Sequence, residues 1–495
     1  MVSFRRHSSF PGPSLGPFAL VVLMFLAASL QVGCASYSDR IQEAHRAAIR
    51  GEPQIAIELI NEELDVDHIM ERPADLGGNR ALLLMERALL LQSAGLYRES
   101  TLDFISIDDR LEWIDLSTQT GAEILRYLYS DAAGAYRPPP HERLLLNLFN
   151  MINFLATQEL EGARVEARRF HILQEYYLEE SLRSALPTVL GLGNYLAGAA
   201  FEASQDYPEA VRFYARAYLY GTWPEGDPNR LLDLIRLLDY RGADLGTFQD
   251  RFAGLRKAAL QRERITSRVF RDRYGRGDTL VVVQTGMVPY RRAQRMPIER
   301  ALAYSNRSPH SSLYISSNDR RQALILYQRG SLNFINAATL TEAGLPPRRV
   351  PQVKIGGRSH SLRDPVSLSA QIYVGWDYVL ATAVAAAISR AVLRATAGTV
   401  TRVATDHVAQ EQGATPLAAG LLSWLLSLAV EGTLSAADTP DTRSWSSLPG
   451  EIHLLRLSLP PGPQDLQVQV GPQTDSRRVD IRPENFQLFN FSRLR

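Results

Sequence analysis

Few residues of this 495-residue chain have the type and spacing that catalysis or metal binding requires. Its nine histidines are isolated, and no HExxH pair or other paired spacing for a metal ion occurs among them. No GxSxG segment exposes a serine nucleophile, and adjacent carboxylates such as Glu62 and Glu63 would point about 100° apart on a helix. The sequence therefore predicts no catalytic residue, no metal and no cofactor. Two carboxylates far apart in the sequence, as in a glycoside hydrolase, remain an open alternative.

The arginines have the most distinctive spacing. Residues 256–300 carry 12 basic and 4 acidic side chains, whereas residues 35–180 carry 26 acidic and 14 basic ones. Spacings of four and three would place Arg264, Arg268 and Arg271 on one face of a helix, where like charges repel mildly. One interpretation is an ordinary solvated face. The other is a partner-binding stripe, which docks on the acidic half, on a partner protein or on an anionic envelope polymer or headgroup.

A second candidate contact is the segment Asp441-Thr442-Arg443-Ser444-Trp445. Arg and Trp are common hot spots of protein interfaces, so Arg443 and Trp445 are candidate partner-binding anchors on a surface rim. The structural alternative is a clasp, in which Asp441 caps or turns the chain, Arg443 pairs with a carboxylate and Trp445 covers a seam between helices and sheet.

The elements that must position these residues follow a leader segment. Arg5, Arg6 and His7 precede a Pro/Gly stretch, and residues 18–30 form an apolar run that is too short to span a hydrocarbon core as a helix. This order of a basic region and a short apolar region predicts a signal peptide over residues 1–33.

Cys34 is the single cysteine and directly follows Gly33. This junction resembles the lipobox of bacterial lipoproteins, in which a cysteine after a small residue is acylated, although Gln31 stands where that family usually has leucine. The resemblance implies acyl chains such as palmitate on Cys34, which would hold the protein durably on a bilayer. Ala35 and Ser36 follow without an aspartate, which by the same resemblance implies the periplasmic side of the outer membrane. An incidental cysteine after an uncleaved anchor is the alternative.

Residues 34–265 show apolar residues at helical spacing and predict four helical hairpins. Corresponding positions in the four units are 44, 63 and 47 residues apart: Pro53, Tyr97, Leu160 and Tyr207. Small residues are expected where two helices touch, with aromatic residues at the turn and in the groove behind: Ala44, Ala88, Gly198, Tyr207, Ala210, Tyr214 and Ala217. The alternation resembles that of tetratricopeptide (TPR) repeats, which present a concave surface to a partner. An irregular bundle with alanine-rich contacts is the alternative.

From about residue 275 the pattern changes to short β-rich runs. Strands are predicted at TLVVVQT (279–285), SSLYISS (311–317), ALILYQ (323–328) and QVKIG (352–356), then at IHLLRLSL, DLQVQV, RVDI and FQLFNF. Between these groups, buried helices are predicted over residues 370–394 and 416–434, because each is too short or too charged to cross a membrane. We therefore predict an α+β chain, with an N-terminal TPR-like α-helical solenoid at 34–265 and a mixed α/β C-terminal domain at 275–495.

Three segments, at residues 194–218, 277–289 and 436–462, resemble a family of uncharacterised bacterial lipoproteins. That family combines a lipobox, repeat-like helices and a C-terminal mixed domain with an Asp-Thr-Arg-Ser-Trp segment. The resemblance implies a fold plan and an envelope location, but no known activity.

The overall charge excludes a general nucleic-acid binder, because 54 Lys and Arg against 53 Asp and Glu create no bulk positive field. We expect a lipid-anchored scaffold or adaptor in cell-envelope assembly or maintenance, not an enzyme. It would bind an envelope protein partner through its repeats and attach to outer-membrane lipid through Cys34. The alternative is a peptidoglycan- or lipid-acting enzyme that uses the C-terminal domain.

Overall fold

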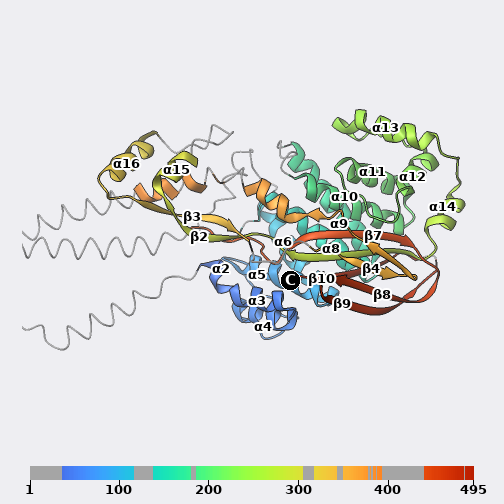
Figure 1. Cartoon of the computed structure of the whole chain (residues 1–495), viewed down its shortest axis with the longest axis horizontal. Coiled ribbons are helices and arrows are strands. Elements are labelled where there is room, and N and C mark those ends of the chain that lie inside the picture. The colour runs from blue at the N-terminus through green and yellow to red at the C-terminus, as the bar shows by residue number, and fades with distance from the viewer. Residues whose placement is uncertain are drawn as a thin grey trace, which may run out of the picture.

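A computed structural model gives the fold of the chain (Figure 1). It describes residues 36–115, 136, 138–179, 186–304, 317–342, 349–376, 380, 383–385, 387–392, 440–483 and 485–494. The signal peptide at 1–33, Cys34 and the predicted helix at 416–434 lie outside the described residues. Most helices precede most strands along the chain, as the α+β prediction requires.

Helices of the N-terminal half form four antiparallel hairpins after a short first helix, α2 (Tyr37–Arg40). The pairs are α3 (Gln42–Arg50) with α4 (Pro53–Leu64), α5 (Arg80–Ser93) with α6 (Tyr97–Asp115), α8 (Pro140–Ala156) with α9 (Leu160–Glu179), and α10 (Pro187–Ala203) with α11 (Tyr207–Leu219). The second helix of each pair begins at one of the four corresponding positions of the predicted repeat: Pro53, Tyr97, Leu160 and Tyr207. Proline stands in the first turn of α4, α8, α10 and α11, where its missing N–H costs no hydrogen bond.

These helices form an inner and an outer row. Nearly every described side chain of α5, α8 and α10 is buried, which indicates helices covered on all sides. The outer helices α6, α9 and α11 cover one side of that inner row, and sheet strands cover the other, through contacts of α5 and α8 with β10 and of α10 with β6. The inner row is therefore enclosed by the chain itself.

The helical part continues with α12 (Arg230–Leu238), the 3-10 turn η2 (Gly246–Phe248), α13 (Gln249–Leu260) and α14 (Ser267–Tyr274). In Figure 1, α14 lies at the right-hand end of the molecule, close to the start of the first long strand.

The central sheet has the strand order β10-β1-β7-β6. Its members are β1 (Asp278–Met287), β6 (Val366–Ser367), β7 (Pro449–Ser458) and β10 (Gln487–Arg493); β1 runs parallel to β10 and antiparallel to β7. Because side chains alternate along a strand, Leu280 and Val282 of β1 face the helices, whereas Val281 and Val283 face away from them.

A second sheet covers that other side. Its order is β5-β4-β8-β9, with β4 (Gln352–Ile355), β5 (Arg358–Ser361), β8 (Gly462–Val470) and β9 (Gln473–Ile481). Val353, Leu466 and Ile481 pack with Val281 and Val283 in one apolar core. The order of layers is thus outer helices, inner helices, central sheet and second sheet.

A smaller unit extends to the left of Figure 1. It contains the ribbon of β2 (Tyr290–Pro297) and β3 (Phe334–Thr341), with α15 (Ile298–Tyr304) and α16 (Ser317–Gln328), and has its own apolar core. The predicted strand at ALILYQ is wrong, because these residues belong to α16. Short apolar runs fit either a strand or a buried helical face, and here the helix packs Ala323 and Leu326 inward.

One hydrophobic core joins the helical half to the central sheet. Residues of α5, α8 and α10 pack in it together with Leu280 and Val282 of β1 and with Ile452 and Leu454 of β7. Within the described part of the chain, no helix combines the length and apolar character needed to cross a bilayer.

A buried arginine cluster and the pocket beside it

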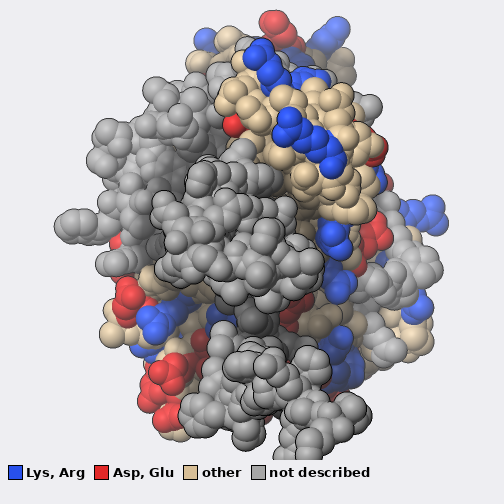
Figure 2. All heavy atoms as spheres, turned by 90° about the vertical axis from the view of Figure 1, so that its left-hand side faces the viewer, with Lys and Arg blue, Asp and Glu red and all other residues tan. Residues whose placement is uncertain are grey.

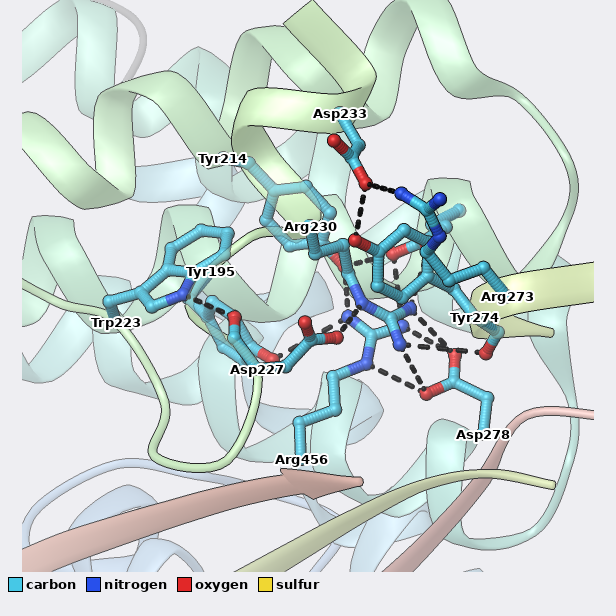
Figure 3. Close-up of polar contacts among 11 residues, drawn as sticks. Tyr195, Tyr214, Trp223, Asp227, Arg230, Asp233, Arg273, Tyr274, Asp278 and Arg456 are labelled. Carbon is cyan, nitrogen blue, oxygen red and sulfur yellow. Dashed lines mark hydrogen bonds and ion pairs between the residues drawn. The ribbon is translucent and has the colours of Figure 1, made fainter. Parts of the chain in front are cut away.

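Two buried arginines hold the helices to the central sheet. Arg230 is the first residue of α12, and Arg456 lies on β7, where its even position places it on the helix-facing side with Ile452 and Leu454. Both side chains reach Asp278, the first residue of β1 (Figure 3). We call Arg230, Arg456, Asp278, Glu202 and Asp227 the junction cluster.

The junction cluster pairs its charges with close, multiple contacts. Arg456 Nε and Nη2 donate to the two oxygens of Asp278 at 3.0 and 2.7 Å, and Arg230 Nη1 and Nη2 reach the same carboxylate at 3.0 and 3.1 Å. Glu202 of α10 lies between the arginines, with its oxygens 2.8 Å from Arg230 Nη1 and 2.9 Å from Arg456 Nη2. The Tyr214 hydroxyl donates to Glu202 at 2.7 Å. Such forked contacts satisfy charges that water cannot reach.

Two glycines allow the backbone to approach this cluster. Gly277 has φ +57°, and a Cβ atom there would lie 2.0 Å from the carbonyl oxygen of Leu459. Gly226 has φ +92°, and its Cβ would lie 2.6 Å from the carbonyl oxygen of Arg456. Any other residue would therefore be strained at either position and would displace β7.

The electrostatics of the junction cluster favour permanent charge. Burial alone would raise the pKa of Asp278, but the charges and hydrogen bonds of Arg230 and Arg456 hold it below its ordinary value. Burial alone would lower the pKa of Arg456, yet Asp278 and Glu202 raise it well above the ordinary value. Asp278 thus stays ionised at neutral pH, which suits a structural role better than proton transfer.

Asp233 of α12 connects the cluster region to α14. It accepts hydrogen bonds from Arg262 at 2.5 Å, from Arg273 at 2.6 Å and from the Tyr274 hydroxyl at 2.6 Å. Burial alone would raise the pKa of Asp233, but these donors lower it. Helix α14 is therefore held in place by one carboxylate with three partners.

A pocket of about 420 Å³ opens beside this cluster, between α10, α14 and the start of β1. Its walls carry three arginines, three carboxylates and three aromatic rings: Arg268, Arg271, Arg276, Glu202, Asp272, Asp278, Tyr207, Phe270 and Phe486. Glu202 and Asp278 are already paired with the buried arginines behind the wall. The arrangement can bind a charged molecule.

The predicted arginine stripe is only partly formed. Arg264 precedes α14, which begins at Ser267, so Arg264 does not share a helix face with Arg268 and Arg271. The prediction of three arginines on one face is therefore wrong, because Thr266 caps the helix by accepting from the N–H of Val269. Arg268 and Arg271 come together at the pocket.

The acidic partners of this basic segment also differ from the expectation. Arg262 and Arg273 pair with Asp233, and Arg256 pairs with Asp239. These carboxylates lie in or next to α12, not in residues 35–180.

Arg443 and Trp445 are not surface anchors. Arg443 is 2% exposed and Trp445 is 1% exposed. Arg443 pairs with Asp441 at 2.9 Å, and the Trp445 ring packs edge-on against Phe104 and Phe149. The prediction of partner contacts here is wrong, because the segment is buried against α6 and α8 and acts as the alternative clasp.

Two buried glutamates of the inner helices complete that clasp. Glu86 of α5 accepts from the backbone N–H groups of Ser446 and Ser447 at 2.9 and 2.8 Å and from the Ser446 hydroxyl at 2.7 Å. Glu142 of α8 accepts from the Trp445 N–H at 3.1 Å and from the Tyr136 hydroxyl. From here on, "the clasp" means residues 441–447 with Glu86 and Glu142.

The residues predicted to pack between repeats all lie in the helical half. Five small residues are buried in the helical half: Ala44, Ala88, Gly198, Ala210 and Ala217. A Cβ atom on Gly198 would lie 2.5 Å from the Tyr214 ring, so glycine is required for this approach of α10 and α11. Tyr207 opens α11 and packs on Phe270 of α14, with 5.3 Å between the ring centres.

The residues of the junction cluster and the glutamates of the clasp were not among the candidates predicted from the sequence. A signal was present, because Arg456 interrupts the apolar run IHLLRLSL, and Glu86 and Arg87 interrupt RALLLMERALLL. A charge inside an apolar stretch of a buried element requires a partner elsewhere in the fold.

Among the described residues, no group of three or more His, Cys, Asp and Glu side chains is arranged to hold a metal ion. Comparison of the chain with protein-family models, with curated proteins and with solved structures finds no match.

Proposed function

We propose that this protein is a lipid-anchored periplasmic adaptor of the outer membrane, which binds an envelope protein partner through its helical half. The observation that carries the proposal is the enclosure of the inner helices by the central sheet. Because the chain itself covers that inner face, the proposed partner surface is the outer row of helices. This proposed surface differs from the concave groove through which an open array of helical repeats binds its partner.

The outer helices carry exposed apolar side chains that support this assignment. On α9, Ile172 is 64% exposed and Val165 is 44% exposed, and a spacing of seven places both on one helix face. Leu102 of α6 and Tyr218 of α11 are also exposed. A contiguous exposed apolar patch marks an interaction site, and we propose that these side chains form such a patch across the outer helices.

We also propose that the four hairpins are degenerate TPR-like repeats. The contacts between successive helices and the small residues at Gly198 and Ala210 support this. A spacing of 44 to 63 residues between units, longer than the usual 34, requires the inserted segments between hairpins.

The anchor at Cys34 gains support from the smaller unit. Cys34 lies two residues before Ser36, and α2 contacts β2 of that unit. The unit carries seven arginines against three acidic residues over 290–304 and 317–342, and Lys and Arg side chains gather on the upper part of the described surface at this end (Figure 2). An acyl chain on Cys34 would bring this basic unit close to anionic headgroups, which would attract its arginines.

The enzyme alternative has weaker support. Glu202 and Asp278 are the buried carboxylates of the pocket, and both are held by Arg230 and Arg456. A general acid or base needs a pKa near the working pH, whereas the pKa of Asp278 is lowered.

Photocrosslinking in cells tests the partner surface. A photoreactive phenylalanine at Ile172 or Val165 should give the same crosslinked protein, and the matched control at exposed Phe334 of β3 should not. If all three positions give the same products, or if the two outer-helix positions give none, the outer row is not the partner surface.

Acyl labelling tests the anchor. Cys34→Ser should abolish incorporation of a palmitate analogue and release the protein from the membrane fraction. Unchanged membrane fractionation with residues 1–33 still attached would contradict the lipoprotein assignment.

A further inference from the structure

We propose that the pocket beside the junction cluster is a binding site for a phosphate monoester, held by Arg268, Arg271 and Arg276. This inference does not depend on the adaptor function or on the anchor. It rests on the charge, shape and position of the pocket.

The charges of the pocket leave a positive surplus. Of its three carboxylates, Glu202 and Asp278 are occupied by Arg230 and Arg456, which lie behind the wall. Asp272 is then the one remaining carboxylate of the lining, and it lies 3.4 Å from Arg276. The rim of the pocket, formed by Arg268, Arg271, Arg276 and Asp272, therefore carries a surplus of two positive charges. The junction cluster behind the wall, with three carboxylates against two arginines, offsets one of them.

Two of these arginines are available to a ligand. Arg268 and Arg271 are exposed, and neither makes an ion pair with a carboxylate in the described part of the chain. Other arginines nearby have carboxylate partners: Arg262 and Arg273 both form ion pairs with Asp233. Two unpaired arginines on one short helix repel each other, which is unfavourable for folding unless an anion binds between them.

The chemistry of the rim favours phosphate. A guanidinium group presents a planar fork of N–H donors that matches phosphate oxygens, and a doubly charged phosphate monoester can engage more than one fork. The rings of Tyr207, Phe270 and Phe486 form an apolar part of the pocket wall next to the arginines of the rim. A volume of about 420 Å³ accommodates a phosphate together with a compact organic body.

The rigid mounting of α14 supports a preformed site. Asp233 binds Arg262, Arg273 and Tyr274, and the Tyr274 ring lies under the Arg230 guanidinium at 4.8 Å. The rim is thereby fixed to the junction cluster before any ligand arrives, which lowers the entropic cost of binding.

Calorimetry with the whole Cys34→Ser chain in detergent tests the site, using glucose 1-phosphate with glucose as the uncharged control. We expect saturable binding of glucose 1-phosphate and none of glucose. Arg268→Gln with Arg271→Gln should weaken the affinity about tenfold or more, because two charge-assisted contacts are lost. The charge-matched control, Arg321→Gln with Arg329→Gln on and after α16, should leave it unchanged.

A second variant separates a pocket from a general positive field. Ala203→Trp fills the pocket without changing any charge, so it should abolish binding while the melting temperature stays close to that of the parent. Unchanged binding in this variant, or equal losses in the two double-arginine variants, would overturn the proposal.

Vesicles distinguish a lipid headgroup from a soluble phosphate. The same chain is sedimented with phosphatidylcholine vesicles that contain or lack phosphatidic acid, whose headgroup is a phosphate monoester. Co-sedimentation that needs phosphatidic acid, Arg268 and Arg271 supports the site with a lipid source. Binding of glucose 1-phosphate alone supports a soluble source, and binding of neither overturns the proposal.

Discussion

The junction cluster and the clasp both tie the helical half to the C-terminal part, but they solve the problem of buried charge differently. In the junction cluster, Arg230 and Arg456 neutralise Asp278 and Glu202 by direct ion pairs. In the clasp, Glu86 and Glu142 receive N–H groups of three consecutive residues, 445–447, together with hydroxyl groups.

That difference decides how each region responds to pH. The arginines keep the pKa of Asp278 low. In the clasp, burial raises the pKa of Glu142 to about 7, although the Tyr136 hydroxyl and the Trp445 N–H oppose this. Burial would also raise the pKa of Glu86, but His45 and the serine contacts hold it below its ordinary value. Asp278 of the junction cluster thus stays ionised at neutral pH, whereas the clasp contains a carboxyl group, that of Glu142, that titrates there.

Breaking the junction cluster should have the largest effect. Arg456→Met leaves Asp278 and Glu202 buried with one arginine between them, so the free energy of unfolding should fall by about 3–5 kcal/mol. Urea unfolding measures this. Arg477→Met is the control, because Arg477 is an exposed arginine above the Phe491 ring, and it should cost less than about 1 kcal/mol. Similar losses in both variants would show that the buried ion pairs contribute no more to stability than an exposed arginine does.

Removing the aromatic centre of the clasp should cost nearly as much. Trp445→Ala deletes a fully buried ring between Phe104 and Phe149, and we expect a loss of about 3–5 kcal/mol in urea unfolding. Trp445→Phe keeps a ring, and the indole N–H has no hydrogen-bond partner among the described residues, so this control should cost much less. A small effect of the alanine variant would mean that the clasp is not tightly packed.

The pH dependence sharpens the comparison further. The folded-state pKa of Glu142 is about 7, above its ordinary value of 4.5, so its stabilising contribution is complete below about pH 4.5 and is lost as the pH rises through 7. Relative to the parent, Glu142→Gln should therefore gain about 3 kcal/mol in unfolding free energy between pH 4.5 and 8.

The matched variant in the junction cluster is Asp278→Asn. In the parent protein the pKa of Asp278 is lowered, so the stabilising contribution of this carboxylate is lost only as the pH falls through that low value. The destabilisation caused by Asp278→Asn should then be constant between pH 5 and 8. A pH-dependent loss in this variant, or a constant difference for Glu142→Gln, would contradict the assignment of the two clusters.

The smallest expected effect concerns how α10 supports the junction cluster. Gly198→Ala brings a Cβ atom to 2.5 Å from the Tyr214 ring, whose hydroxyl binds Glu202, so it should cost about 1–3 kcal/mol. Gly254→Ala on α13 is the control, since its Cβ would meet nothing within 4 Å. It should stabilise the protein by up to about 1 kcal/mol in thermal unfolding, because alanine favours a helix. Equal changes of stability in Gly198→Ala and Gly254→Ala would contradict a close contact between Gly198 and the Tyr214 ring.

The sequence alone determined the hairpin helices and β1, although the apolar run ALILYQ wrongly predicted a strand where α16 forms. The hairpin helices follow from apolar residues at helical spacing and from small residues at Gly198 and Ala210, and β1 follows from its unbroken apolar run. These signals depend on neighbours within one or two turns of the chain, so no distant contact was needed to find them.

Only the tertiary structure decided which charges meet and which surfaces stay open. Asp278 and Arg456 are 178 residues apart, and Trp445 lies 303 residues from Glu142, so no local pattern relates them. Arg443 and Trp445 look like contact residues in the sequence, yet they are buried once the segment packs against the inner helices. The physical reason is that a buried charge or ring is stable only with partners that chain folding brings from elsewhere. Composition and periodicity carry no record of those partners.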